Sequence, residues 1–225
     1  MEVFCEEQGI PVDRCGKLIV ASDEGEVSRL DTLYSRAKEN GVTCSRIGPD
    51  EIREIEPHAV GLAALYIPEA GVLDYGLVCV HLGARIVELG ADIQLNVACT
   101  GFGAEGADVV VETNAGQLRA GTVVNCAGLH SDGLVKMSGA KSDAQIVPFR
   151  GEYYALREQA LQYCRGLIYP VPNPTFPFLG VHLTRTVGGG VICGQSIRCL
   201  NTDGEGYKEE WVTKWDGAEA RDIEA

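Results

Sequence analysis

Apolar residues near the start of the chain fall first into a short run and then into a helical repeat. Residues 16–21, GKLIVA, are typical of a buried strand. Ser22 or Asp23 can then cap a helix over residues 24–41, because Leu, Leu and Ala recur on one helical face before a closing glycine. The pattern therefore predicts a strand followed directly by an amphipathic helix.

The same alternation of short apolar runs and helical repeats continues as far as about residue 144. A short helix is expected at residues 49–55, a strand at 62–68, and a strong amphipathic helix at 75–90 with Asp74 as its cap. Strands are then expected in ADIQLNVACT, DVVVET and TVVNCAG, at residues 91–100, 108–113 and 122–128.

Beyond about residue 145 the pattern changes to strands alone, separated by turns rich in Pro or Gly. These strands are expected within residues 146–156, 166–172, 178–185 and 188–196. Residues 201–225 are acidic and show no core pattern. Helices mixed with many strands predict an α/β (α+β) fold.

Residues 101–106, GFGAEG, match the glycine pattern of a dinucleotide-binding turn. Such a turn must open a helix, whose N-terminus then holds the pyrophosphate. Here the following residues, ADVVVET, alternate in the manner of a strand, and Glu105 would face the anion. We therefore predict a hairpin turn at GFGAEG and no phosphate site.

Composition narrows the classes of partner. The 225 residues carry a net charge of −13 and no basic cluster, which argues against nucleic acid. No apolar run is long enough for a membrane span, and the acidic N-terminus resembles neither a signal nor a transit peptide. The nine cysteines form no C-x-x-C pair, so we expect no metal site and buried free thiols in a reducing compartment.

Five stretches carry a resemblance to a known family: RCGKLIVA (14–21), GLAALYIPEAGVLDY (61–75), VVNCAGLHSDGLVKMSG (123–139), IVPFRGEYY (146–154) and GLIYPVPNPTFPFLGVHLTR (166–185). Together they resemble the D-amino-acid-oxidase-like FAD-dependent oxidoreductases, and within them the L-2-hydroxyglutarate dehydrogenases and oxidases. The likeness covers about residues 1–195.

The resemblance implies a partial FAD-binding Rossmann-like domain joined to a mixed or antiparallel β-sheet substrate domain. Residues 1–68 and 145–200 would belong to the substrate domain, residues 69–144 to the C-terminal part of the FAD-binding domain, and residues 201–225 to an acidic tail. The family's opening nucleotide-binding turn and its closing segment find no counterpart in this sequence, so we expect a chain truncated at both ends.

The resemblance also implies FAD as cofactor and assigns residues to it. Cys99 stands where backbone groups of a strand read the adenine edge, with an ordinary strand residue as the alternative. Cys126, Ala127 and Gly128 stand where a small-residue turn follows the pyrophosphate and ribityl chain, with a simple strand-end turn as the alternative.

Oxidation of a 2-hydroxy acid requires a group that accepts the hydroxyl proton and cations that bind carboxylates. VHLTR offers His182 and Arg185, but their odd spacing puts them on opposite faces of a regular strand. Between the two we favour His182 as base or hydrogen-bond donor. Arg150 and Tyr169 are further candidates for orienting the substrate, and a structural role is open for each.

The function implied is oxidation of L-2-hydroxyglutarate to 2-oxoglutarate by hydride transfer to flavin. The alternatives are a related oxidase of an amino acid or glycerol phosphate, and a non-catalytic fragment. The expected partners are a small-molecule 2-hydroxy acid and an electron acceptor, oxygen or a quinone. The expected location is intracellular: mitochondrial in a eukaryote, cytoplasmic or membrane-associated in a bacterium.

Overall fold

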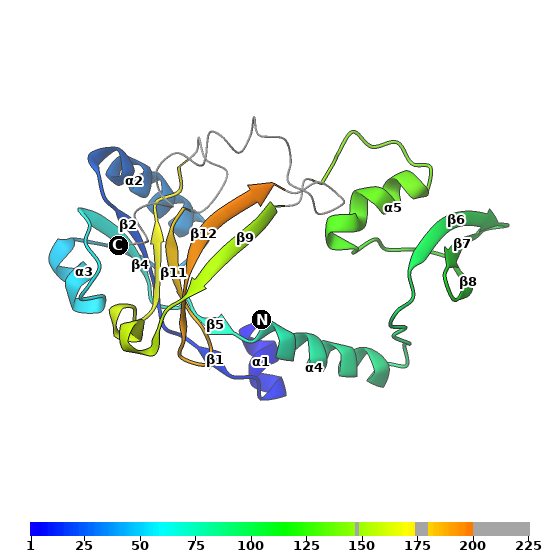
Figure 1. Ribbon diagram of the computed structural model, residues 1–225, viewed down its shortest axis with the longest axis horizontal. Coiled ribbons are helices and arrows are strands. Elements are labelled where there is room, and N and C mark those ends of the chain that lie inside the picture. The colour runs from blue at the N-terminus through cyan, green and yellow to red at the C-terminus, as the bar shows by residue number, and fades with distance from the viewer. Residues whose placement is uncertain (147–148, 174–179, 200–225) are drawn as a thin grey trace. The chain divides into compact units, whose positions relative to one another are not determined.

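The computed structural model describes residues 1–146, 149–173 and 180–199, which form two compact units (Figure 1). The first unit combines Met1–Arg85 with Gly151–Ser196, and the second is built around Ile86–Arg150. No helix among the described residues is long and apolar enough to cross a membrane. The predicted mixture of helices and strands is confirmed.

A seven-stranded mixed sheet organises the first unit. Its strands lie in the order β3-β4-β2-β10-β11-β12-β9. Strand β2 pairs in parallel with β10 and antiparallel with β4, so segments that are distant in the sequence meet at the centre of the sheet. The strands are β2 (Lys17–Ala21), β3 (Ser45–Ile47), β4 (Ala63–Ile67), β9 (Phe149–Ala155), β10 (Leu167–Pro170), β11 (His182–Arg185) and β12 (Val191–Cys199).

Helices α2 (Glu24–Glu39) and α3 (Pro49–Ile55) have clear local causes. The Asp23 carboxylate accepts a hydrogen bond from the Glu26 amide at 2.8 Å and so caps the start of α2. Helix α3 starts at a proline, whose missing N–H costs nothing in the first turn. Both helices form where the sequence predicts them.

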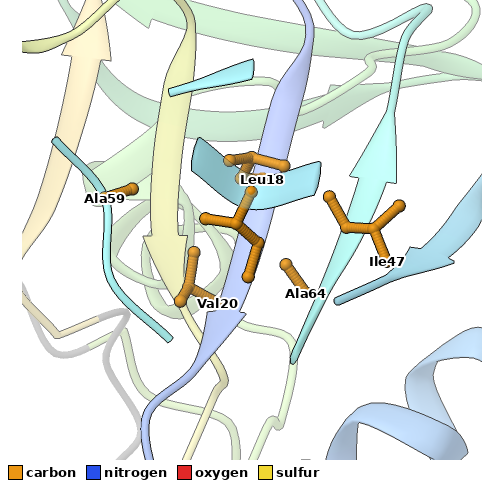
Figure 2. Close-up of a cluster of buried hydrophobic side chains, with 6 residues drawn as sticks. Leu18, Val20, Ile47, Ala59 and Ala64 are labelled. Carbon is orange, nitrogen blue, oxygen red and sulfur yellow. The ribbon is translucent and has the colours of Figure 1, made fainter. Parts of the chain in front are cut away.

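These two helices cover opposite faces of the sheet, because successive strand residues point to opposite sides. Leu18 and Val20 of β2 pack with Ile52 of α3. Figure 2 shows part of this core. Ala21, one residue further on, packs with Leu30 of α2. The uninterrupted apolar run in β2 is thus explained by burial of both faces.

A smaller hydrophobic cluster of the first unit includes a helix that the apolar pattern of the sequence does not predict. Helix α1 (Glu2–Gln8) packs Cys5 against Val78 of α4 (Tyr75–Glu88), beside the paired strands β1 (Val12–Asp13) and β5 (Val72–Leu73). EVFCEEQ carries a single buried side chain, so no helical repeat is visible in it. Helix α4 itself is predicted correctly.

The second unit holds the antiparallel sheet of β6 (Cys99–Glu105), β7 (Asp108–Thr113) and β8 (Gly116–Ala120), followed by the 3-10 turn η1 (Gly128–His130) and α5 (Ser131–Met137). GFGAEG leads into strand β7, as predicted, but it is mostly strand itself. Only Gly106 and the next residue form the turn, where Gly106 adopts a positive φ of 63°.

One predicted strand is absent from the second unit and another is shorter than predicted. Residues 122–127 are irregular and lead into η1 at Gly128, and strand β6 begins only at Cys99 rather than at residue 91. An apolar run becomes a strand only when neighbouring backbone pairs with it. No strand among the described residues pairs with either segment, and Val124 is exposed.

A buried carboxylate joins the end of α3 to the start of β10. Glu56 is 2% exposed. Its two oxygens accept the Arg165 amide at 3.0 Å, and one of them accepts the Gly166 amide at 2.6 Å. These bonds compensate for burial of the charge and fix the chain as it enters β10, after the turn η2 (Glu158–Tyr163).

We predict that Glu56→Gln lowers the free energy of unfolding by about 1–3 kcal/mol, because one carboxylate oxygen is replaced by an amide donor that faces backbone N–H groups. Denaturant unfolding measures the change. Glu54→Gln, on the exposed side of the same helix, is the control. Equal stability of the two variants would contradict this role of Glu56.

Candidate active site

One face of the large sheet carries a polar cluster beside the core that α2 covers. Leu167 pairs with Lys17 of β2 on one side and with Thr184 of β11 on the other. Paired positions share a face, and so do residues two apart. Lys17, Tyr169, Thr184 and His182 therefore point to the same side of the sheet.

Contacts hold this cluster together around the Tyr169 ring. The Tyr169 hydroxyl lies 3.2 Å from the Thr184 hydroxyl, and the Tyr169 and His182 ring centroids are 4.8 Å apart. From the neighbouring strand β2, the Lys17 ammonium nitrogen lies 3.8 Å from the Tyr169 ring centroid, a cation–π contact. Burial lowers the pKa of Lys17.

His182 is the one imidazole buried among the described residues, at 4% exposed. Its Nδ1 lies 2.9 Å from the Gly180 carbonyl oxygen. A carbonyl can only accept, so Nδ1 carries the proton and donates it. In the neutral ring Nε2 is then the acceptor, which is the form a general base requires.

Tyr153 and Gly194 complete the surroundings of the imidazole. The Tyr153 ring approaches His182 edge-on at 5.8 Å, and Gly194 of β12 pairs directly with His182. A Cβ on Gly194 would lie 2.6 Å from Cε1 of Tyr153 and 3.1 Å from Cε1 of His182. Only a residue without a side chain leaves room for both rings.

Neither of the two candidate arginines is seen in this cluster. Arg185 sits on the opposite face of β11, and its Nε donates to Asp13 Oδ2 at 2.9 Å. Arg150 lies in β9, but its side chain is outside the described residues. The structure thus brings His182 and Tyr169 together and separates them from Arg185.

Lys17 and Tyr153 join the cluster although neither is among the residues predicted from the sequence. In the sequence, Lys17 is distinguished only as a lone cation at the first position of an otherwise apolar strand. Tyr153 carried no distinct signal, because it reaches His182 only through the order of the strands in the sheet.

The second unit holds the residues expected to contact FAD. Cys99 opens β6, an edge strand whose outer backbone groups have no strand partner among the described residues. It also lines an open cavity of about 310 Å³ with Val97, Val111 and Leu118 among its neighbours. Asp92, Gln94 and Thr113 also line this cavity, so it is of mixed polarity. An unpaired strand edge beside it leaves backbone groups free to contact the edge of an adenine ring.

The turn at Cys126, Ala127 and Gly128 is open as well. Cys126 and Gly128 are exposed, and Gly128 has a positive φ of 57° with nothing within 4 Å of the place a Cβ would take. A ligand can therefore approach the backbone closely here. Both segments fit the cofactor that the resemblance implies.

The cysteines only partly follow the expectation of buried free thiols. No disulfide joins the eight cysteines whose side chains the structure describes, but Cys79 and Cys126 are exposed. Cys164 is buried, and burial, reinforced by the nearby Glu56 carboxylate, raises its pKa from 9.0 to about 12. The apolar context of a cysteine in the sequence does not by itself decide whether the thiol is covered.

Cys164 should therefore resist alkylation in the folded protein in mildly alkaline buffer, because the reactive thiolate does not form. Mass spectrometry after brief iodoacetamide treatment should find Cys79 and Cys126 modified and Cys164 modified only after unfolding. Native Cys164 reacting as fast as Cys79 would contradict this prediction.

Gly194→Ala should destabilise the fold by about 1–3 kcal/mol, because the new methyl group displaces Tyr153 and His182. Thermal unfolding measures the loss, and a shifted His182 imidazole resonance would show its cause. Gly103→Ala is the control, since the nearest atom to its Cβ would be a side-chain carbon at 3.8 Å. An undisturbed imidazole in Gly194→Ala would count against this packing.

The mixed seven-stranded sheet with its buried imidazole, and the open turn at Gly128, occur in a chain whose sequence matches a family of flavin-dependent oxidoreductases. The family described as FAD dependent oxidoreductase matches residues 1–221. The chain belongs to this family.

Individual relatives of the chain indicate which members of the family it resembles. L-2-hydroxyglutarate dehydrogenase of Indibacter alkaliphilus is 38% identical over 93% of this chain and 53% of its own length. The human protein named L-2-hydroxyglutarate dehydrogenase, mitochondrial, is 36% identical over 91% of this chain and 47% of its own. The chain thus spans about half the length of the relatives it matches.

Two solved structures show the fold. L-proline dehydrogenase from P. horikoshii superimposes with a TM-score of 0.76 at 24% identity, over 87% of this chain and 52% of its own. L-alpha-glycerophosphate oxidase from Mycoplasma pneumoniae, solved with FAD bound, gives 0.74 at 22% identity, over 89% and 52%. The expected fold class is confirmed.

Proposed function

We propose that the protein containing this chain oxidises L-2-hydroxyglutarate to 2-oxoglutarate with FAD as the hydride acceptor. The observation that carries the proposal is the buried His182, whose Nδ1 is committed to the Gly180 carbonyl and whose Nε2 is the acceptor. Relatives named L-2-hydroxyglutarate dehydrogenase support the choice of substrate.

The proposed chemistry divides between a proton and a hydride. FAD supplies the two-electron acceptor that takes the hydride from C2 of the substrate. His182 Nε2 accepts the hydroxyl proton as the C–O bond becomes C=O. The Tyr169 hydroxyl, held by Thr184, orients the substrate oxygen, and Arg150 is the proposed partner of a substrate carboxylate. We assign Arg185 a structural ion pair with Asp13.

Residues of the second unit are proposed to hold the cofactor. The backbone at Cys99 would contact the adenine, and the turn at Cys126, Ala127 and Gly128 would follow the pyrophosphate and ribityl chain. Residues 69–144 are accordingly proposed as the FAD-binding part of the chain, and residues 1–68 and 145–200 as its substrate domain.

The cellular setting is proposed from the relatives. One of them carries the word mitochondrial in its name. We propose an intracellular location for this protein, which would be mitochondrial in a eukaryote and cytoplasmic or membrane-associated in a bacterium. The substrate is a small 2-hydroxy acid, and the electron acceptor is proposed to be oxygen or a quinone.

The test is an FAD titration followed by addition of L-2-hydroxyglutarate under anaerobic conditions. The proposal expects saturable FAD binding and bleaching of the flavin absorbance. Bleaching only by an amino acid or by glycerol phosphate would replace this substrate with one of the alternatives. Failure to bind FAD, or bleaching by none of the three, would favour a non-catalytic fragment.

His182→Asn should slow flavin reduction about 100-fold or more, because the proton acceptor is lost while the fold and FAD binding persist. Stopped-flow absorbance gives the rate. His58→Asn is the matched control, since His58 is an exposed imidazole that also packs on a tyrosine, Tyr163, with ring centroids 4.8 Å apart. Similar rates for the two variants would remove His182 from the mechanism.

A further inference from the structure

Lys17 is a cation in an unusual position for a structural lysine. It occupies the first position of β2, is half-buried, and is followed by four apolar residues. Its ammonium group lies over the Tyr169 ring. No ion pair to a described carboxylate accompanies this contact, and burial alone accounts for its lowered pKa.

A half-buried ammonium without a carboxylate partner is unfavourable in the free protein. A cation–π contact offsets part of this cost. It provides neither a negative charge to neutralise the ammonium nor acceptors for its three N–H donors. A methionine would fill the same space without the penalty. Retention of the charge therefore points to an anion that arrives from outside the described chain.

The position of Lys17 relative to the proposed base indicates which anion this is. Strand β10, which carries Tyr169, lies between β2 and β11, and the Tyr169 ring centroid is 3.8 Å from the Lys17 ammonium and 4.8 Å from the His182 ring centroid. A substrate whose hydroxyl contacts His182 would extend across the Tyr169 side chain toward Lys17. The group that reaches Lys17 is then the end of the substrate distant from the reacting carbon.

We propose that the Lys17 ammonium binds the distal carboxylate of the substrate and so selects dicarboxylic over monocarboxylic 2-hydroxy acids. This inference rests on the proposed function, since it places the substrate hydroxyl at His182. Arg185 does not compete for this role, because it is paired with Asp13 on the other face of the sheet.

Equilibrium binding tests the site without any turnover. Glutarate, a five-carbon dicarboxylate that cannot be oxidised here, is compared with pentanoate by calorimetry on the FAD-loaded protein. Lys17→Met should weaken glutarate binding about ten- to hundredfold, because a charge-assisted hydrogen bond is lost. Pentanoate binding should not change.

Lys38→Met is the matched control. Lys38 also lies over a tyrosine ring, that of Tyr34 at 5.3 Å, but on the exposed surface of α2. Its removal should leave binding of both ligands unchanged. Lys17→Arg should recover part of the glutarate affinity because it keeps the charge. Lys17→Met should also melt no lower than the parent protein, whereas a structural lysine would lower the melting temperature when removed.

Kinetics then separate this inference from the proposed function. With L-2-hydroxyglutarate, Lys17→Met should raise KM with little change in kcat, and with L-2-hydroxypentanoate neither should change. Equal losses for both substrates, or no loss of glutarate affinity, would overturn the role of Lys17. If the parent protein binds glutarate through Lys17 but L-2-hydroxyglutarate does not reduce its flavin, the proposed function fails and the dicarboxylate site stands.

Discussion

The parallel pairing of β2 with β10 is the interaction on which the first unit depends. It joins a strand near the N-terminus to one that begins at Leu167, and it places Lys17 beside the strand that carries Tyr169. Both strands are short and apolar, so neither has an independent reason to be stable. Their pairing is supported from outside by α2 and α3 on the two faces and by Glu56 at the entry to β10.

The candidate active site lies where this core gives way to polar side chains on the same sheet face. Ile19 and Ala21 of β2 pack beneath α2, whereas Lys17, two residues before Ile19 on the same face, meets Tyr169. The rigid apolar part of each strand fixes the polar part, because the backbone is continuous between them. The proposed proton acceptor, His182, and the Lys17 cation are held in this way and would need little reorganisation when a substrate binds.

The family gives this arrangement its chemical context. In an FAD-dependent oxidoreductase the cofactor carries the redox step, and the protein has to position substrate groups and accept a proton. His182 and Tyr169 suit the second task, and the open turn at Gly128 suits contact with a cofactor. Lys17 adds a means of distinguishing substrates by their second charge.

The sequence alone determined the local elements and the family. Helix α2 could be predicted from its Asp23 cap, α3 from Pro49, and α4 from Asp74 and its apolar repeat, because these signals act within one turn of chain. The long stretches at residues 146–154 and 166–185 carry much of the resemblance to the family. The opposite directions of His182 and Arg185 also followed from strand geometry alone.

Tertiary structure alone decided which strands pair and therefore which side chains meet. Lys17 and Tyr153 reach the cluster through the order of the strands in the sheet. Arg185 forms an ion pair with Asp13 instead. The apolar residues 122–127 form no strand, and no strand among the described residues pairs with them. An apolar pattern indicates that a segment will be buried, but it does not indicate which other segment will cover it, because the hydrophobic effect is non-directional. Pairing in a sheet is chosen by the whole set of competing strands at once.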